Sequence, residues 1–581
     1  MAYATISQRK LAELDAKIPS EWRLSESQIP PGMLSPAESI TNVKEYGRVS
    51  VMDIPRTCGL LSGHELEITE QYDVRELLRA MADKRLTAEE VTTAFCKRAA
   101  IAHQLTRCLT EPLFDRAVQR ARDLDAYLRR TGRPIGPLHG LPVSVKDCFH
   151  IKGVDTSIGI AALVSRPATE DAPLIQLLTA LGAIVLAKTN VPQTMGALDS
   201  ANFVFGRTLN PLNRALTAGG SSGGEGVLVA LRGSMVGFGT DIGGSIRVPA
   251  MCTGVYGFKP SVGRVPFGGQ ESGQIPGKGR MALQAVAGPI ARSVADLGAV
   301  MAEIVPRAEL FGEDCIPGLW AGEFPRSGLG SGQRRKVTIG VLRSDGVVQP
   351  LPPVARVLDE VAQTLRRTPG VEVVEIPVLP ALSKCQGLAG RLMGVDDGSA
   401  MLDLLESTGE PLIPWLQGRV KRGKALSVVQ LAQLQAQRSA VERELLGMWM
   451  RDGDRLAGRQ VDAIIHPVAP HPVPEIDRYN AVGYGSSFVL LDYPAGVIPV
   501  RKFREADLEL GKEMTAPVLG SWDKANRLLW NEKTVDRRVY LDSPLSIQVV
   551  TPKQHDYELY RAMELIDRAV RAEEHKTVAK L

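Results

Sequence analysis

The spacing of hydrophobic and polar positions changes along this chain. In residues 74–105 apolar side chains recur every three or four positions, a period that predicts helices. Thr87 precedes one of these helical segments and Glu90 follows three residues later, which is the pattern of a capped helix start. We therefore expect residues 1–130 to be mainly helical.

Beyond this region helical and strand-like patterns alternate. Residues 136–147 predict a turn and then a short apolar strand that ends at Lys146. Residues 171–190 and 224–241 each predict a helix followed by a buried strand, with Gly182 ending the first of these helices. Such alternation is typical of an α/β fold, a large twisted mixed sheet with helices on both faces.

The second half of the chain continues this alternation after a Gly- and Arg-rich segment, Ala321 to Lys336, which we interpret as a surface loop or linker. Strands are expected at 337–342, 371–378, 461–470 and 488–500, helices at 353–367 and 554–575, and irregular helical structure at 380–450. Because sheet segments lie on both sides of the linker, we expect one large fold. Its predicted parts are an N-terminal helical arm (1–70), the main α/β domain (71–575) and a C-terminal tail (576–581).

The composition argues against some classes of function but does not identify one. Hydrophobic residues make up 44% and charged residues 23% of the 581 positions, as in an ordinary globular protein. A net charge of +4 without a basic run, and only 5% aromatic residues, argue against nucleic-acid binding. Seven cysteines without a Cys-x-x-Cys pair favour a reducing compartment and no structural zinc.

Targeting signals leave two locations open. The N-terminus has no apolar core of a secretory signal, and the longest uncharged apolar stretch, 172–187, is too short to predict a membrane span. The expected location is therefore cytoplasmic. The final residues Ala579, Lys580 and Leu581 resemble the peroxisomal address Ser-Lys-Leu, although a frayed helix end would also account for them.

Two Gly- and Ser-rich segments carry the candidate chemistry. In Thr217–Gly226, "TAGGSSGGEG", a phosphate loop is excluded because the required lysine is missing. Ser221 and Ser222 formally fit a nucleophile elbow, but the residues before them predict a loop, and a flexible loop is the third interpretation. The second segment, "GFGTDIGGSIRVPA" (237–250), places Ser245 behind two glycines, so the backbone there can approach another group closely.

A serine nucleophile needs a base to take its proton. His466 and His471 are candidates, but both lie in the Pro-rich segment "HPVAPHPVPE". The other candidate is Lys146 at the end of an apolar strand, where loss of hydration would lower its pKa and leave a neutral amine. Alternatively, Lys146 is an ordinary strand-end lysine paired with Asp147 or with solvent.

Together these segments resemble the amidase signature family. The resemblance rests on "GGSSGGEG", "GTDIGGSIRVPA", the lysine segment "LPVSVKD", "KTNVPQTM" (188–195) and "GPIARSVADL" (288–297), and covers about residues 70–570. The N-terminal "IPSEWRL" is similar to the acetamidase-like branch of the family. The resemblance implies an amide hydrolase that works on a small-molecule amide without cofactor or metal, and a homodimer by analogy.

The resemblance also implies roles for individual residues. Ser245 would be the nucleophile that forms an acyl-enzyme, Ser221 would relay its proton, and Lys146 would be the base. The peptide before Ser221 would be cis. The remaining implied positions are the backbone N–H groups of Ile242, Gly243, Gly244 and Ser245 as an oxyanion hole, Met195 lining the site, Ser222 in structural support, and Asp241 and Arg247 bracing the loop.

Other activities fit the same acyl-enzyme. The chain could be the glutaminase-type subunit of an amidotransferase, although "EWRL" and the long N-terminal helical region argue against this. An acyl transferase that forms amides, or an esterase, would need no different residues. The sequence carries no pattern that identifies the acyl or amine part of the substrate.

Overall fold

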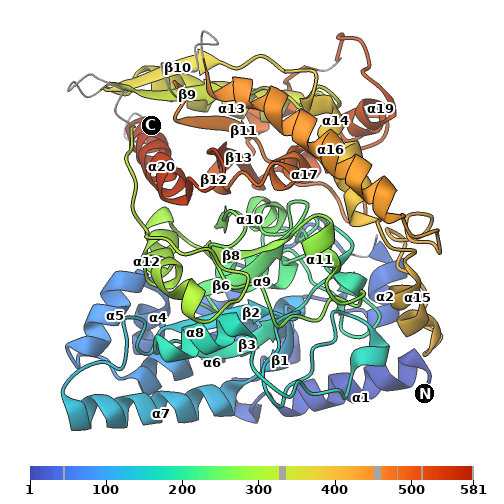
Figure 1. Cartoon of the computed structure of the whole chain (residues 1–581). Coiled ribbons are helices and arrows are strands. Elements are labelled where there is room, and N and C mark those ends of the chain that lie inside the picture. The colour runs from blue at the N-terminus through green and yellow to red at the C-terminus, as the bar shows by residue number, and fades with distance from the viewer. Residues whose placement is uncertain (44–45, 326–334, 451–459, 480–481, 512–513, 579–581) are drawn as a thin grey trace.

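One mixed β-sheet of eleven strands runs through the described part of the molecule (Figure 1). The computed structural model describes residues 1–581 apart from 44–45, 326–334, 451–459, 480–481, 512–513 and 579–581. The strand order is β1-β3-β2-β6-β8-β7-β12-β13-β11-β9-β10, from the bottom to the top of Figure 1. The predicted fold class is therefore confirmed.

The strands of this sheet are β1 (Leu109–Pro112), β2 (Pro142–Lys146), β3 (Ile184–Thr189), β6 (Val236–Asp241), β7 (Tyr256–Lys259), β8 (Val286–Ala291), β9 (Val337–Val341), β10 (Val371–Glu375), β11 (Ala463–Pro467), β12 (Ala495–Lys502) and β13 (Pro544–Val550). Two short strands, β4 (Ala201–Asn202) and β5 (Gly206–Arg207), form a separate pair. Strand β2 pairs in parallel with both β3 and β6, so its side chains point into helix-covered faces and all five of its residues are buried.

Helices cover both faces of the sheet. A Cβ on Gly239 of β6 would meet Ser222, next to helix α9 (Gly223–Ala230), and one on Gly257 of β7 would meet helix α10 (Arg247–Thr253). Phe258, the neighbour of Gly257, pairs with Gly496 of β12, where a Cβ would meet Met563 of α20 (Asp556–Val578). Because neighbouring strand residues point to opposite faces, α9 and α10 lie on one side and α20 on the other.

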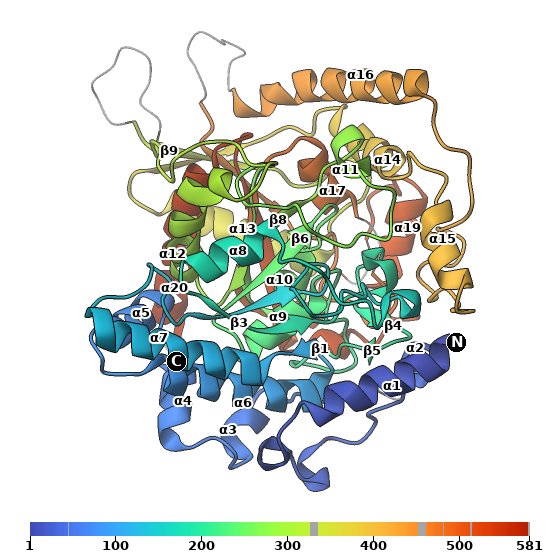
Figure 2. The same cartoon turned by 60° about the horizontal axis from the view of Figure 1, so that its bottom comes forward.

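Further α-helices complete the layers. They are α1 (Tyr3–Ala16), α2 (Pro36–Thr41), α3 (Ile54–Thr57), α4 (Gly63–Glu70), α5 (Val74–Ala82), α6 (Ala88–Thr106), α7 (Phe114–Thr131), α8 (Pro173–Ala180), α11 (Lys278–Met281), α12 (Val294–Ile304), α13 (Pro352–Arg366), α14 (Leu382–Met393), α15 (Ser399–Glu406), α16 (Val428–Leu445), α17 (Gly483–Leu490), α18 (Glu505–Leu508) and α19 (Ser521–Arg527). Helix α16 lies along the outer edge of the molecule, where Figure 2 shows it at the top. None of the helices described here is both long and apolar enough to cross a membrane.

Most predicted elements are found, but the start of one predicted strand is wrong and four strands of the sheet were not predicted. The side chain of Thr87 caps α6 together with Glu90, as expected. The strand predicted at 488–500 begins only at Ala495, because the apolar residues 488–490 end helix α17. Strands β1, β7, β8 and β13 were not predicted, whereas residues 1–130 are mainly helical as expected, with β1 as the one strand among the elements described there. Short apolar runs are compatible with a buried helix or a buried strand, so periodicity alone does not separate them. Most of the linker 321–336 lies outside the described residues.

Helix α1 is tied to the sheet through a buried group of charges. Lys10 of α1 forms ion pairs with Glu111 of β1 and, at 2.8 Å, with Asp155. The side chains of Lys10 and Glu111 are only 5% and 2% exposed. Burial by itself lowers the pKa of Lys10, but the two carboxylates outweigh this and hold the pKa above its usual value. The division at residue 70 between an arm and a main domain stays a prediction.

Replacing Lys10 by methionine should therefore destabilise the fold. Breaking a buried ion pair leaves uncompensated charge, here on Asp155 and in part on Glu111, which keeps Lys17 as a second partner at 2.6 Å, and typically costs about 3–5 kcal/mol. The free energy of unfolding, measured by urea denaturation, should fall by about this amount. The control is Arg122→Met, whose partner Glu89 is 42% exposed and which should change stability by about 1 kcal/mol or less. Equal effects of the two substitutions would contradict the assigned role of Lys10.

Candidate active site

Lys146 occupies the carboxyl end of the inner strand β2 and is fully buried. Its Nζ lies 2.6 Å from Ser221 Oγ and 2.8 Å from Thr240 Oγ1. Burial lowers the pKa of Lys146 to about 8, because a charged ammonium loses its hydration there. The site thus holds an amine that gives up its proton near neutral pH in direct contact with a serine hydroxyl.

The alternative pairing of Lys146 with Asp147 or solvent is wrong. Asp147 accepts hydrogen bonds from Thr110 Oγ1 at 2.8 Å and from the Ile158 N–H at 2.7 Å, and lies 3.6 Å from Lys188 Nζ. Consecutive residues at the end of a strand point to opposite sides, which separates the two side chains. Lys146 therefore points toward the two serine segments, whereas Asp147 points to the opposite face of the sheet, where it contacts Thr110 of β1.

Ser221 lies in the turn that leads into helix α9, two residues before the helix begins. The Gly220–Ser221 peptide is cis, as the resemblance implied. Residues 197–199 pack directly against this peptide, since a Cβ on Gly220 would lie 2.6 Å from the Ala197 carbonyl oxygen. Ser200 supports the same turn, because its Oγ donates to the Gly219 carbonyl at 3.0 Å. Only glycine at position 220 allows the two segments to come this close.

Ser245 lies in the short loop between β6 and α10 and is 5% exposed. Its carbonyl accepts a hydrogen bond from the Ser222 N–H at 3.1 Å, and Ser222 Oγ accepts one from the Thr240 N–H at 3.3 Å. Ser222 thus links the segments that carry Ser221 and Ser245. Within the described part of the chain the Ser245 hydroxyl itself makes no hydrogen bond, whereas Lys146 and Ser221 are in direct contact.

The Ser245 loop is held by a buried ion pair. Asp241 and Arg247 are at most 1% exposed and form two hydrogen bonds of 3.0 Å. Although burial by itself raises the pKa of Asp241, the Arg247 guanidinium and the loop N–H groups hold it below its usual value. Arg247 also donates to Gln548 on β13 and to the Gly485 carbonyl on α17, both at 2.9 Å. These bonds connect the loop to both halves of the sheet.

The four backbone N–H groups expected to form the oxyanion hole differ in their hydrogen bonds. The Gly244 N–H donates to Asp241 Oδ1 at 2.8 Å, so it is already used. Among the residues that the structure describes, no hydrogen bond takes up the N–H groups of Ile242, Gly243 and Ser245. The spacing of glycines could not predict which N–H group is already hydrogen-bonded, because that depends on the orientation of the Asp241 carboxylate.

Met195 lies at the end of the short 3₁₀ turn η5 (Gln193–Met195) and is partly buried. The backbone of Met195 has a φ of 56°, a left-handed conformation uncommon for residues other than glycine. The turn is fixed from outside by Glu410, which accepts hydrogen bonds from Gln193 Nε2 at 2.7 Å and from the Ala161 N–H at 2.8 Å. Glu410 had no recognisable sequence signal, and neither did the role of Gln193.

Neither candidate histidine is hydrogen-bonded to Ser245. His466 Nδ1 lies 2.8 Å from the Leu342 carbonyl, and its ring stacks on Tyr484 with centroids 4.6 Å apart. His471 Nδ1 lies 2.8 Å from the Pro472 carbonyl. Burial lowers the pKa of each imidazole to about 4, so both are neutral at physiological pH. The basic group in contact with Ser221 Oγ is the amine of Lys146.

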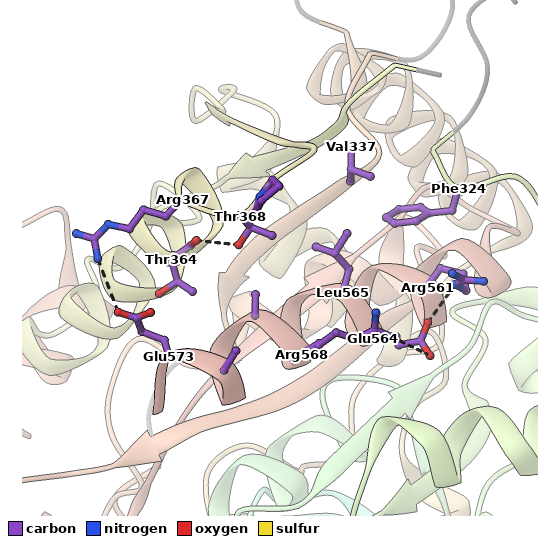
Figure 3. Close-up of a pocket in the computed structure, with 13 residues that line it drawn as sticks. Phe324, Val337, Thr364, Arg367, Thr368, Arg561, Glu564, Leu565, Arg568 and Glu573 are labelled. Carbon is purple, nitrogen blue, oxygen red and sulfur yellow. Dashed lines mark hydrogen bonds and ion pairs between the residues drawn. The ribbon is translucent and has the colours of Figure 1, made fainter. Parts of the chain in front are cut away.

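A cavity of about 490 Å³ lies elsewhere, between α13, α20 and the start of β9 (Figure 3). Its floor is apolar, with Phe324, Val337 and Leu565. Charges at its rim are paired, for example Glu564 with Arg561 at 3.2 Å. Among the residues that the structure describes, its lining holds no serine and no lysine. The chemistry therefore points to Lys146 and the two serines rather than to this cavity.

Comparisons with known proteins identify the family of the chain. The family model described as "Amidase" matches residues 90–560. The chain is 33% identical over 551 residues to an acetamidase of Aspergillus oryzae, covering 93% of this chain and 94% of that one. An acetamidase of Emericella nidulans is 34% identical over 551 residues, with 93% of each chain covered. The solved structure of a fatty acid amide hydrolase superposes with a TM-score of 0.82 at 25% identity, covering 97% of this chain and 95% of that one. The chain therefore belongs to the amidase family, the amidase signature hydrolases that cleave the C–N bond of carboxylic amides.

Proposed function

We propose that this amidase works through an acyl-serine intermediate, with Ser245 as nucleophile, Ser221 as proton relay and Lys146 as base. The observation that carries the proposal is the 2.6 Å contact between Lys146 Nζ and Ser221 Oγ in a fully buried position. A lysine is an effective base only when it is uncharged. Its pKa of about 8, far below the usual 10.5, supplies the neutral amine.

In the first half of the reaction Lys146 takes the hydroxyl proton of Ser221, while Ser221 takes that of Ser245. The freed Ser245 oxygen attacks the carbonyl carbon and forms a tetrahedral intermediate. When this intermediate collapses, the C–N bond breaks and the Lys146 ammonium returns its proton through Ser221 to the leaving amine. Water then repeats the same transfers on the acyl-enzyme, which releases the carboxylic acid and restores Ser245.

The developing negative charge on the carbonyl oxygen needs fixed hydrogen-bond donors. We assign this role to the N–H groups of Ile242, Gly243 and Ser245, and not to that of Gly244. Open space next to Gly243, where a Cβ would meet no atom within 4 Å, supports the approach of a substrate from this side. Loss of one such donor typically costs about 3–4 kcal/mol of transition-state stabilisation.

The substrate we propose is a carboxylic amide of small or medium size. The two similar acetamidases support a small acyl group, and Met195 is assigned to the wall beside the bridging serine. Hydrolysis needs no cofactor in this scheme, because every proton transfer uses a side chain of the protein. The homodimer that the resemblance implies stays a prediction.

The triad assignment is tested by three substitutions and one label. Ser245→Ala and Lys146→Ala should each reduce amide hydrolysis at least about a thousandfold, because nucleophile and base are lost. Ser221→Ala should retain a measurable remainder, since water can replace a relay in part. A fluorophosphonate should label Ser245, located by peptide mass spectrometry, and EDTA should leave the rate unchanged. Labelling of a different residue, or inactivation by EDTA, would exclude this mechanism.

The oxyanion assignment makes a separate prediction about helix α17. A Cβ on Gly485 would lie 2.5 Å from the Gly243 carbonyl oxygen, so Gly485→Ala must push the loop that carries the donors. We expect kcat/KM to fall at least about tenfold, with an overpacking cost of about 1–3 kcal/mol in stability. The control is Gly387→Ala in α14, where a Cβ meets no atom within 4 Å. If Gly485→Ala hydrolyses amides as fast as the control, the loop does not hold the oxyanion.

A peroxisomal location is the second part of the proposal. The tripeptide Ala579-Lys580-Leu581 lies outside the described residues and is assigned on its sequence alone. A fluorescent protein placed at the N-terminus of the full chain should enter peroxisomes, and deletion of the three residues should leave it in the cytosol. Identical distributions of the two fusions would refute the assignment.

A further inference from the structure

A second ionisable group lies beside the triad. Glu225 of helix α9 is fully buried, four residues after Ser221. Its Oε2 accepts a hydrogen bond from Ser144 Oγ at 2.5 Å, and its Oε1 accepts one from Thr189 Oγ1 at 2.7 Å. The carboxyl group therefore lies between α9 and the strands β2 and β3. None of the roles assigned to the triad uses it.

Glu225 shares its side of the sheet with Lys146. Ser144, which holds the carboxyl, is two residues before Lys146 on β2, so both side chains point to the same face. Thr189, the second partner, is paired with Lys146 in the register of β2 and β3. The carboxyl also fills the space over Gly237 of β6, where a Cβ would overlap with it. These contacts place the acid and the amine in one buried layer.

No cation neutralises this carboxyl directly. Among the residues that the structure describes, Glu225 forms no ion pair within 4.0 Å, although it is fully buried. An isolated buried carboxylate is unfavourable, and burial raises the pKa of Glu225 to about 8. Among the described residues, Lys146 is the cation that acts electrostatically on this carboxyl, and the groups that raise the pKa of Lys146 against the effect of burial are Cys148, Asp241 and then Glu225. The two groups therefore titrate in the same pH range and influence each other.

We propose that Glu225 is a positioning residue for proton transfer, because its carboxyl acts, together with Asp241, on the charge of Lys146 across the buried layer between α9 and β2. This inference rests on the proposed function of Lys146 as base. An ionised Glu225 stabilises the ammonium that forms when Lys146 takes the proton from Ser221. A neutral Glu225 leaves Lys146 free to be the uncharged amine. The acid thus strengthens the base without touching the substrate.

The protonation states of Glu225 and Lys146 predict the direction in which the pH dependence of the rate should move. At low pH the pair carries a protonated acid and an ammonium, and loss of one proton yields either the ion pair or two neutral groups. The ion pair is inactive as a base because Lys146 keeps its proton. With an uncharged glutamine at position 225 only the lysine titrates, and it loses its proton at lower pH. An opposite charge nearby shifts a pKa by about one unit or more.

Glu225→Gln tests the inference, because glutamine has the same shape and can bond to both hydroxyls. The acid limb of the kcat/KM profile against pH should move by about one unit to lower pH. The rate at the alkaline plateau should fall about three- to tenfold, because a less basic amine takes a proton less readily. KM should stay unchanged, since Glu225 does not touch the substrate. A residue with only a structural role would lower the rate without moving the acid limb.

A second variant and a control keep the test decisive. Ser144→Ala removes one donor to the carboxylate, which disfavours its ionised form, and should move the acid limb the same way by a smaller amount. Asp296→Asn removes a carboxyl that is also buried but accepts its hydrogen bonds from Ser293 Oγ and the Val74 N–H, away from the site. This variant should leave both the acid limb and the alkaline plateau unchanged. Fluorophosphonate labelling of Ser245 counts the folded, competent molecules, so partial misfolding of a variant does not obscure the result.

The outcomes separate the two proposals. If Ser245 is labelled and Lys146→Ala is inactive, but Glu225→Gln keeps the acid limb of the unmodified chain, the role of Glu225 is refuted and the triad stands. If Ser245 is not labelled in the unmodified chain, the triad itself is refuted. A lower acid limb together with a lower plateau supports the electrostatic coupling.

Discussion

The contact between the buried amine of Lys146 and the hydroxyl of Ser221 is the constraint on which the site depends. A lysine is seldom fully buried, because its ammonium loses strong hydration. Here the loss is imposed by the sheet, since β2 lies between two parallel neighbours and α9 covers its end. The groups offered to Lys146 are hydroxyls, not carboxylates. The fold thereby favours the neutral amine, the form that can accept a proton.

Glycines allow this arrangement, because α9 and its preceding turn approach the sheet without Cβ atoms between them. Gly237 and Gly239 of β6 make room for Glu225 and Ser222, and Gly220 lets residues 197–199 support the turn. The same short stretch of chain, Ser221 to Glu225, thus carries the hydroxyl in contact with Lys146, the link to Ser245 and a carboxyl buried in the same layer as the lysine. A side chain at any of the three glycines would separate groups whose chemistry depends on contact.

Features of the fold and the site that follow from local sequence patterns could be predicted, whereas features that depend on contacts between distant segments could not. Helix and strand alternation identified strand β2 and its terminal Lys146, since these are local patterns. The two Gly-Ser segments identified the serines through their resemblance to a family. Thr240 as a partner of Lys146, and Glu410 as a support of Met195, depend on contacts between distant segments, and Gly244 depends on the direction of one carboxylate. Glu225 did carry a signal, as the single charge in an apolar helix, but its partners are set by the sheet register.

A lowered pKa does not by itself distinguish the base from other buried lysines. Lys259 is also buried, and burial lowers its pKa to about 8 as well. Its Nζ, however, donates to the Pro260 carbonyl at 3.0 Å, a group that has no proton to give. Lys10 is buried beside two carboxylates and keeps its charge. Only for Lys146 do burial, the absence of a directly paired carboxylate among the described residues and contact with a serine hydroxyl coincide. The partner atom, more than the pKa, therefore decides which lysine can take part in the reaction.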